Sequence, residues 1–280
     1  MTTPPAARFE VVSDAGRKGS AAPWLTLVHG ATQHRGVFSA QVAAFRADFR
    51  LLLIDLPGHG LSASLPGPYG MGEYAASVRA AMDKAIGEGG VEGGMGEAGA
   101  ERTHFWGTHT GAGVGLLLAA REPARFASLV LEGPVFPDRQ PPYAVEMIAQ
   151  VKRLAAGRGL DAARRHWWER SEWFEVMRRN PETCRAAGHL AMVSEFQGGP
   201  WLDTQAPARV ASVDNRLAEL GLPVLIVNGE HELADFVQAA GQLSSLLPHA
   251  RRVVIADAGG FPLWEFPDRV NAEVRRFLRG

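Results

Sequence analysis

The stretch that most constrains the fold is residues 102–121, RTHFWGTHTGAGVGLLLAAR. A short apolar run, from His104 to Trp106, leads into Gly-Thr-His-Thr-Gly, and small and apolar residues with helical spacing follow. A strand, a tight Gly-x-X-x-Gly turn and a helix have, in this order, the layout of a nucleophile elbow. Such a turn holds its middle residue in a strained conformation and lifts that side chain clear of the sheet. Ser, Cys or Asp is expected there, but this chain has His109.

The composition indicates a full globular core and excludes several kinds of partner. With 280 residues, 46% of them hydrophobic, the chain is long enough for a large α/β domain. Its net charge is −1 and charges of both signs are scattered along it, so we expect no nucleic-acid or anionic-membrane partner. The single cysteine, Cys184, excludes an internal disulfide and a multi-cysteine metal site.

Hydropathy predicts a protein without a membrane anchor. No apolar stretch reaches the roughly 18–20 residues that span a bilayer, and the N-terminal MTTPPAARFE has no apolar signal core. The sequence therefore predicts a cytoplasmic protein, and we expect a monomer or a homodimer.

Strand and helix patterns alternate along most of the chain. Apolar runs typical of buried strands, and one weaker edge strand, lie at 8–12, 24–28, 51–56, 104–106, 129–132, 224–227 and 252–255. Helical spacing separates them at 38–45, 73–86, 206–220, 233–247 and 269–278. Strands spaced by helices predict a mostly parallel central sheet flanked by helices on both faces. The glycine-rich stretch 87–99 is expected to be a solvated loop on the face opposite the site.

The alternation breaks between residues 137 and 202, which are mostly helical in pattern. We therefore expect a core made of residues 1–136 and 203–280, with an inserted helical cap at 137–202 over the edge where such folds bind ligands. The cap carries Trp167, Trp168 and Trp173. Adjacent residues of a helix face different directions, so at least one of these rings is expected to line the pocket roof. An aromatic, uncharged pocket favours a small apolar or aromatic molecule.

Five separated motifs resemble the α/β-hydrolase family, in the pattern of its capped enol-lactonases and C–C hydrolases. They are HGA at 29–31, DLPGHGLS at 55–62, GTHTG at 107–111, PVLIVNGEHE at 223–232 and AGGFPLWE at 258–265. The resemblance covers nearly the whole chain and implies an α/β-hydrolase fold with a helical cap. It also implies that the backbone N–H groups of Ala31 and Thr110 form an oxyanion hole. His29 and Gly30 are expected beside the substrate, as is Phe261, and no cofactor or metal is implied.

At the positions that match the family's catalytic residues, this chain lacks the residues that the family's usual chemistry needs. The nucleophile position holds His109, the acid position holds Glu232 in place of the usual Asp, and the histidine position holds Gly260. A Ser-His-Asp mechanism needs a hydroxyl, a base and an orienting carboxylate. Because two of these are missing, we do not expect an acyl-serine route.

The replacements suggest a rebuilt catalytic pair. The imidazole of His109 reaches roughly 2 Å further than a serine hydroxyl, Glu232 is one methylene longer than Asp, and Gly260 leaves a hole between them. We expect His109 to bond to Glu232 directly or through one water, to titrate near neutrality, and to act as general acid or base. Lyase-like chemistry or hydrolysis by a His-activated water, on a small apolar carbonyl compound, suits such a pair.

Less specific interpretations remain open. The chain is alternatively a catalytically inactive small-molecule sensor or binding protein, or a pseudo-hydrolase scaffold. An open aromatic pocket favours an enzyme or a binder, and a filled one favours a scaffold. Weaker alternatives are a threonine nucleophile, Thr108 or Thr110, and a metal held by His231 with His109 and Glu232. Glu132 is expected to be a turn or rim residue.

Overall fold

The computed structural model describes residues 5–14, 22–87 and 102–279. A single sheet forms the centre of this part, with strand order β1-β3-β2-β4-β5-β6-β7. All its neighbouring strands pair in parallel except β1, which runs antiparallel to β3. The strands are β1 (Arg8–Val12), β2 (Trp24–Val28), β3 (Arg50–Asp55), β4 (Thr103–Thr108), β5 (Phe126–Glu132), β6 (Val224–Gly229) and β7 (Ala250–Ile255).

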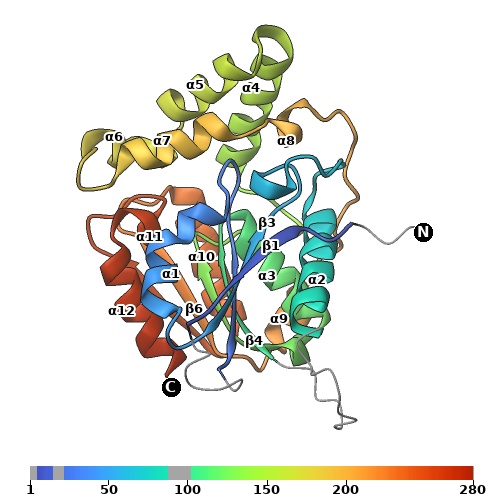
Figure 1. Cartoon of the computed structure of the whole chain (residues 1–280), viewed down its shortest axis with the longest axis vertical. Coiled ribbons are helices and arrows are strands. Elements are labelled where there is room, and N and C mark those ends of the chain that lie inside the picture. Colours follow the sequence, from blue (N-terminus) through green and yellow to red (C-terminus); the bar gives the residue numbers. More distant parts are fainter. Residues whose placement is uncertain (1–4, 15–21, 88–101, 280) are drawn as a thin grey trace.

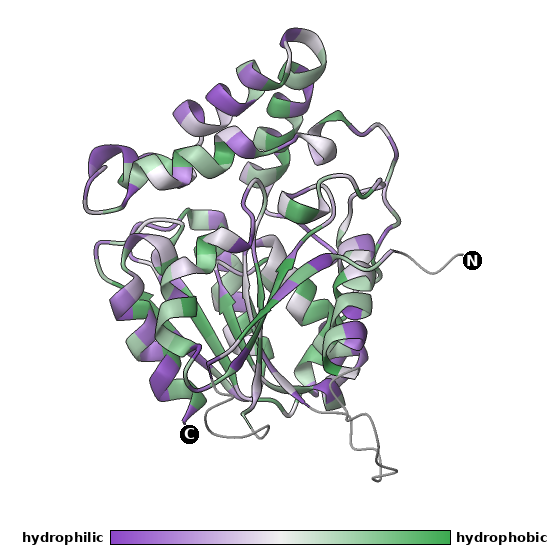
Figure 2. Ribbon diagram, in the orientation of Figure 1, coloured by the Kyte–Doolittle hydropathy of each residue, from purple (hydrophilic) through white to green (hydrophobic). Residues whose placement is uncertain are grey.

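Helices cover both faces of the sheet (Figure 1). Helix α1 packs beside α12, while α2 packs on α3, α3 on α9, and α9 on α10. The inner strands are apolar along their length because both faces are covered. Figure 2 shows these hydrophobic strands at the centre and hydrophilic residues on the outside of α12. The helices are α1 (Ser39–Phe45), α2 (Met71–Gly87), α3 (Thr110–Arg121), α9 (Asp214–Ala218), α10 (Ala234–Leu246), α11 (Pro262–Glu265) and α12 (Pro267–Leu278).

A layer of further helices lies over the carboxyl ends of the strands (Figure 1). Helix α4 packs on α5 and α8, and α5 packs on α7. The Nε1–H of Trp167 donates to Thr32 Oγ1 at 3.0 Å, which ties this layer to the loop after β2. Its elements are α4 (Pro142–Arg158), α5 (Leu160–Arg170), η5 (Glu172–Phe174), α6 (Glu175–Arg179), α7 (Ala186–Glu195) and α8 (Gly199–Leu202).

The sheet and helix order agree with the sequence-based prediction, with one clear error. The helix predicted over 206–220 is reduced to α9, and residues 203–213 contain no helix. The apolar spacing of this stretch was misleading, and Pro207 does not explain it, because proline is tolerated in the first turn of a helix. The glycine-rich stretch 87–99 lies almost entirely outside the described residues.

Candidate active site

His109 occupies a strained turn between β4 and α3. Its backbone has φ 48° and ψ −108°, a region that a residue with a side chain rarely adopts. A Cβ on Gly107 would lie 2.4 Å from the carbonyl group of Gly111, and one on Gly111 would lie 2.1 Å from Val28 O. Both positions therefore require glycine, and the elbow geometry predicted from the sequence is confirmed.

The His109 ring is enclosed by aromatic side chains. The ring centroids of Phe261, Phe236 and Trp173 lie 5.0, 5.3 and 6.3 Å from its own, and the residue is only 8% exposed. Burial lowers the pKa of His109 to about 4. The imidazole is therefore neutral at pH 7, and the expected titration near neutrality is wrong because the aromatic rings exclude water from the charged form.

Glu232 lies near His109 but does not bond to it directly. Its Oε1 accepts the N–H of Leu233 at 3.0 Å, while Oε2, like His109 Nε2, has no partner among the described residues. A Cβ added to Gly133 would lie 2.8 Å from Nε2 and 3.3 Å from Oε2, so the two atoms flank the same point. Burial, and then the charge of Glu265, raise the pKa of Glu232 to about 8. Glu232 thus keeps its proton at neutral pH and offers His109 no negative charge.

Gly133 was not recognised from the sequence, although it makes room for the larger side chain on the elbow. It follows β5 directly and has φ +50°. A side chain here would press on the imidazole of His109. The only feature of the sequence that marks Gly133 is its place in Glu-Gly-Pro at the end of a strand. Such a tripeptide is typical of any turn, so it does not indicate a site residue.

The hole expected at Gly260 is closed by the cap. A Cβ on Gly260 would lie 3.0 Å from Cδ1 of Trp173 and 3.4 Å from Oε1 of Glu232. The indole of Trp173 therefore stands against Gly260, on the side where an imidazole would project. Sequence spacing had no means of showing this, because Trp173 and Gly260 are 87 positions apart in the chain.

The loop after β2 is held by buried hydrogen bonds. His29 Nε2 accepts the N–H of Leu56 at 3.0 Å, so its Nδ1 carries the proton and donates to Gly30 O at 2.7 Å. Burial lowers the pKa of His29 to about 4, which keeps this arrangement neutral. Gly30 N–H donates in turn to Oε1 of Gln33 at 2.9 Å. His29 is fully buried, so it shapes the loop that presents Ala31.

A small, mostly apolar cavity of about 70 Å³ lies over the elbow. It brings together most of the residues predicted for the site: Ala31, His109, Thr110, Trp167, Trp173 and Phe261. Thr110 is the first residue of α3, where a backbone N–H has no acceptor inside the helix. His29 and Gly30 are not in the lining. The apolar lining also includes residues that the sequence did not single out, namely Met71, Val135, Pro141, Ala144, Ile148 and Phe236.

Trp168, which the sequence also placed among the substrate-binding residues, does not line this cavity. Its ring packs 4.8 Å from that of Phe174, and it lines a surface hollow with Asp161 and Arg164. The adjacent pair of tryptophans therefore divides as the helical geometry predicts, with Trp167 facing the site.

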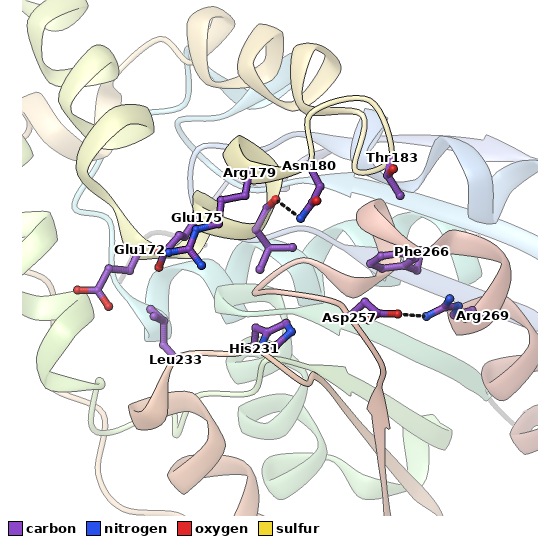
Figure 3. Close-up of a pocket in the computed structure, with 11 residues that line it drawn as sticks. Glu172, Glu175, Arg179, Asn180, Thr183, His231, Leu233, Asp257, Phe266 and Arg269 are labelled. Carbon is purple, nitrogen blue, oxygen red and sulfur yellow. Dashed lines mark hydrogen bonds and ion pairs between the residues drawn. The ribbon is translucent and has the colours of Figure 1, made fainter.

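A larger and more polar hollow, of about 590 Å³, lies between the cap and the loops after β6 and β7 (Figure 3). Two ion pairs line it: Arg269 with Asp257 at 3.2 Å, and Arg179 with Glu175. His231 lines this hollow, whereas His109 lines the other cavity. In residues 5–14, 22–87 and 102–279, no group of three His, Cys, Asp or Glu could hold a metal. We place the candidate active site at the smaller cavity because only that one contains the elbow residue.

Glu132 and Glu265 add two more buried carboxyl groups near Glu232. Glu132 is fully buried, so its predicted place on a rim is wrong. Burial, then the charges of Glu232 and Glu265, raise the pKa of Glu132 well above its usual value, while contact with the Thr108 hydroxyl acts the other way. Burial also raises the pKa of Glu265 to about 7.

Comparison with known proteins agrees with the fold. A sequence model of the α/β hydrolase fold family matches residues 23–267. The chain is 24% identical to a pimeloyl-[acyl-carrier protein] methyl ester esterase from Nitrosospira multiformis, over 92% of this chain and 95% of that protein. It is 29% identical to the protein of the same name from Xanthomonas oryzae pv. oryzae, over 91% and 95% of the two chains.

Solved structures show the same fold. The enol-lactonase from Burkholderia xenovorans LB400 superposes with a TM-score of 0.76 at 23% identity, over 98% of this chain and 96% of that one. A thermophilic esterase from Thermogutta terrifontis gives 0.76 at 24% identity, over 97% and 92%. Among the described residues, no helix is both long and apolar enough to cross a membrane.

Proposed function

This chain belongs to the α/β-hydrolase fold family, and we propose that it is an enzyme acting on a small, mostly apolar carbonyl compound by acid–base chemistry at His109. The observation that carries the proposal is the state of His109. Its imidazole sits on a strained elbow, is neutral, and has no partner on Nε2 within the part of the chain that the structure describes. A degenerate elbow could relax the strain of about 1–3 kcal/mol, whereas this one retains both of the glycines that enforce it.

Burial assigns opposite roles to the two ionisable groups. His109, with a pKa of about 4, is free to accept a proton above that pH. Glu232, with a pKa of about 8, holds a proton to donate below that pH. Groups whose surroundings separate their pKa values in this way are suited to act as base and acid. Between pH 4 and pH 8 the pair is ready to react, with His109 as the base and Glu232 as the acid.

The proposed reaction uses the backbone donors of the elbow and of the loop after β2. The substrate carbonyl oxygen accepts the N–H groups of Ala31 and Thr110, which stabilise the negative charge that develops on it. In hydrolysis, His109 Nε2 takes a proton from the attacking water and Glu232 gives its proton to the leaving oxygen. The imidazolium then returns a proton to the Glu232 carboxylate. In a lyase-like reaction, Nε2 takes the proton from the substrate. The esterase and enol-lactonase names of similar proteins support a carbonyl substrate.

The second candidate is a non-catalytic binding protein or a scaffold, and the small size of the cavity favours the scaffold. The cavity of about 70 Å³ is well below the roughly 300–1,000 Å³ of usual ligand sites. His109 Nε2 also has almost no exposed surface. A substrate therefore reaches Nε2 only when Trp173 or the cap helices move. In an enzyme or a binding protein, Trp173 or the cap helices move when the small molecule binds. In a scaffold they do not.

A panel of small esters, enol lactones and β-diketones tests the proposal, using wild type, His109→Gln and the control Trp168→Phe outside the cavity. We expect turnover of at least one class, with a loss of about 10²-fold or more in His109→Gln and little change in the control. No turnover together with no ligand-induced change in Trp173 fluorescence would support the scaffold. Strong esterase activity that survives His109→Gln would overturn the assignment of the base.

A further inference from the structure

The cavity over the elbow and the polar hollow of Figure 3 are lined by the same two short segments of the chain. In η5 and the turn after it, Trp173 lines the cavity, whereas Glu172 and Val176 line the hollow. The N-terminal end of α10 divides in the same way, with Leu233 in the hollow and Phe236 in the cavity. Only the side chains of these segments therefore separate the two spaces.

Each of the two spaces has what the other lacks. The hollow, of about 590 Å³, falls within the roughly 300–1,000 Å³ of usual ligand sites, but His109 is not in its lining. The cavity contains His109, Ala31 and Thr110 but holds only about 70 Å³. If the two were joined, a space of the size of a ligand would lie against the elbow.

The indole of Trp173 is held in the partition by packing and not by a hydrogen bond. The ring centroids of Trp167 and Tyr143 lie 5.2 Å from its own, and that of Phe236 lies 5.4 Å away. Its Nε1–H is buried and has no acceptor among the described residues. Trp167, the other tryptophan of the cavity, donates its Nε1–H to Thr32 Oγ1 at 3.0 Å and is anchored there.

The unpartnered N–H favours movement of the indole. A buried donor without an acceptor costs free energy, and a turn toward the hollow returns the Trp173 Nε1–H to water. Trp106 Nε1 also lacks an acceptor, but its ring is enclosed in the core by Phe38 and Phe45 and lines neither space. Of the two tryptophans that line the cavity, Trp173 is the one that is not anchored.

We infer that Trp173 is the gate between the hollow and the cavity: when its indole turns aside, a substrate enters from the hollow and brings its carbonyl group to His109. The inference rests on the proposed function for the reaction, whereas the gate itself requires none. The open site takes an elongated carbonyl compound with an apolar reacting end and a polar far end, because polar side chains such as Glu172, Asn180 and Thr183 line the hollow. Trp173 thus determines the length of substrate that is accepted.

Hydrogen exchange at the indole N–H groups tests the gate without a substrate. Protein labelled with ¹⁵N-tryptophan carries seven indole groups, and Trp173→Phe and Trp167→Phe identify two of their signals. Trp173 and Trp167 are similarly buried, with 6% and 3% of their surface exposed. We expect Trp173 Nε1–H to exchange at least about tenfold faster, because it needs only a local opening. Equal rates at the two indoles would overturn the gate.

Filling the hollow tests the route. Leu233→Trp places a large ring in the hollow, whereas the control Leu190→Trp places the same ring in a separate surface hollow. We expect Leu233→Trp to slow exchange at Trp173 by about tenfold and Leu190→Trp to leave it unchanged. The same rate in wild type and in both variants would show that the indole does not open toward the hollow, and would overturn the inference.

Two ketones without a leaving group, acetone and 9-hydroxy-2-nonanone, test the size of the open site by calorimetry. Trp173→Ala, or Trp173→Phe where alanine prevents folding, should bind the long ketone about tenfold more tightly than wild type, because no closed state competes. Leu233→Trp should bind it about tenfold more weakly, and Leu190→Trp should match wild type. Acetone should show little change, since it does not reach the hollow.

A long ketone that binds equally to wild type, the Trp173 variant and Leu233→Trp would contradict the inference. These measurements involve no turnover. A protein that hydrolyses no ester but passes them has lost the proposed function and kept the gate, whereas turnover that depends on His109 together with equal ketone binding has the opposite meaning.

Discussion

Two parts of the site are built under different constraints: the elbow that carries His109, and the pair of loops that carry Glu232 and Gly260. The glycines of the elbow face backbone atoms, with a Cβ on Gly111 only 2.1 Å from Val28 O. Gly260 faces a side chain of the cap, with Cδ1 of Trp173 at 3.0 Å. A backbone neighbour in a central strand has no room to move, whereas an indole on the cap can turn.

This difference explains which features of a hydrolase site remain. The turn and the strained residue are fixed by the close approach of Gly111 to the end of β2. On the proposed assignment, the backbone donors beside the turn are retained as well, and the side chains that carry chemistry differ because their neighbours are side chains that adapt. The following changes test this contrast, from the largest expected effect to the smallest.

Gly111→Ala should have the largest effect, because the added methyl group meets Val28 O in the middle of the sheet. We expect a loss of at least about 3 kcal/mol in the free energy of unfolding, measured by urea denaturation. Gly157→Ala is the control, since its Cβ has no neighbour within 4 Å and alanine is the better helix former. Equal stabilities of these two variants would show that the elbow is not constrained by backbone contact.

Glu232→Gln should change how stability depends on pH. The folded protein holds this proton up to about pH 8, whereas an unfolded glutamate releases it near pH 4.5. Folding therefore takes up a proton between these values, and this contribution to stability is complete below pH 4.5 and is lost as the pH rises through 8. The variant should be more stable than wild type at pH 9, by about 5 kcal/mol.

Denaturation curves at pH 5, 7 and 9 measure this effect, with the exposed Glu219→Gln as the control. An equal pH dependence in wild type and Glu232→Gln would show that the carboxyl is already ionised in the folded protein. It would then be a conventional charged acid.

Restoring a serine triad should have the smallest effect. His109→Ser with Gly260→His supplies the missing groups, but Trp173 occupies the space that the new imidazole needs. Adding Trp173→Ala should raise hydrolysis of a small ester by about tenfold over the double variant, if Ala31 and Thr110 still stabilise the oxyanion. No gain in a folded triple variant would show that the backbone donors have also lost their geometry.

The fold could be predicted from the sequence because its signals are local. The runs of β2, β3, β5 and β6 are apolar on both faces, which is the pattern of a covered parallel sheet. The elbow was recognisable because its two glycines are needed at a fixed spacing. The helix predicted over 206–220 was wrong over most of its length, because apolar spacing alone does not establish a helix and only α9 forms there.

The chemistry of the site could not be predicted in the same way. The enclosure of His109 by Trp173, Phe236 and Phe261 joins segments far apart in the chain. That enclosure lowers the pKa of His109 from the ordinary value of a histidine. The placement of Thr108 beside Glu132 likewise depends on the register of two strands. Residue types showed which groups are present, and packing determines where their protons lie.

An NMR titration of His109 and Glu232 tests the central claim most directly. His109 ring carbons and Glu232 carboxyl carbons are followed from pH 3.5 to pH 9, with His109→Gln and Glu232→Gln identifying the signals. We predict that His109 remains neutral down to about pH 4 and that Glu232 loses its proton near pH 8. A His109 midpoint between pH 6 and pH 7, with Glu232 ionised below pH 5, would contradict the account and show that the two groups form a charged pair.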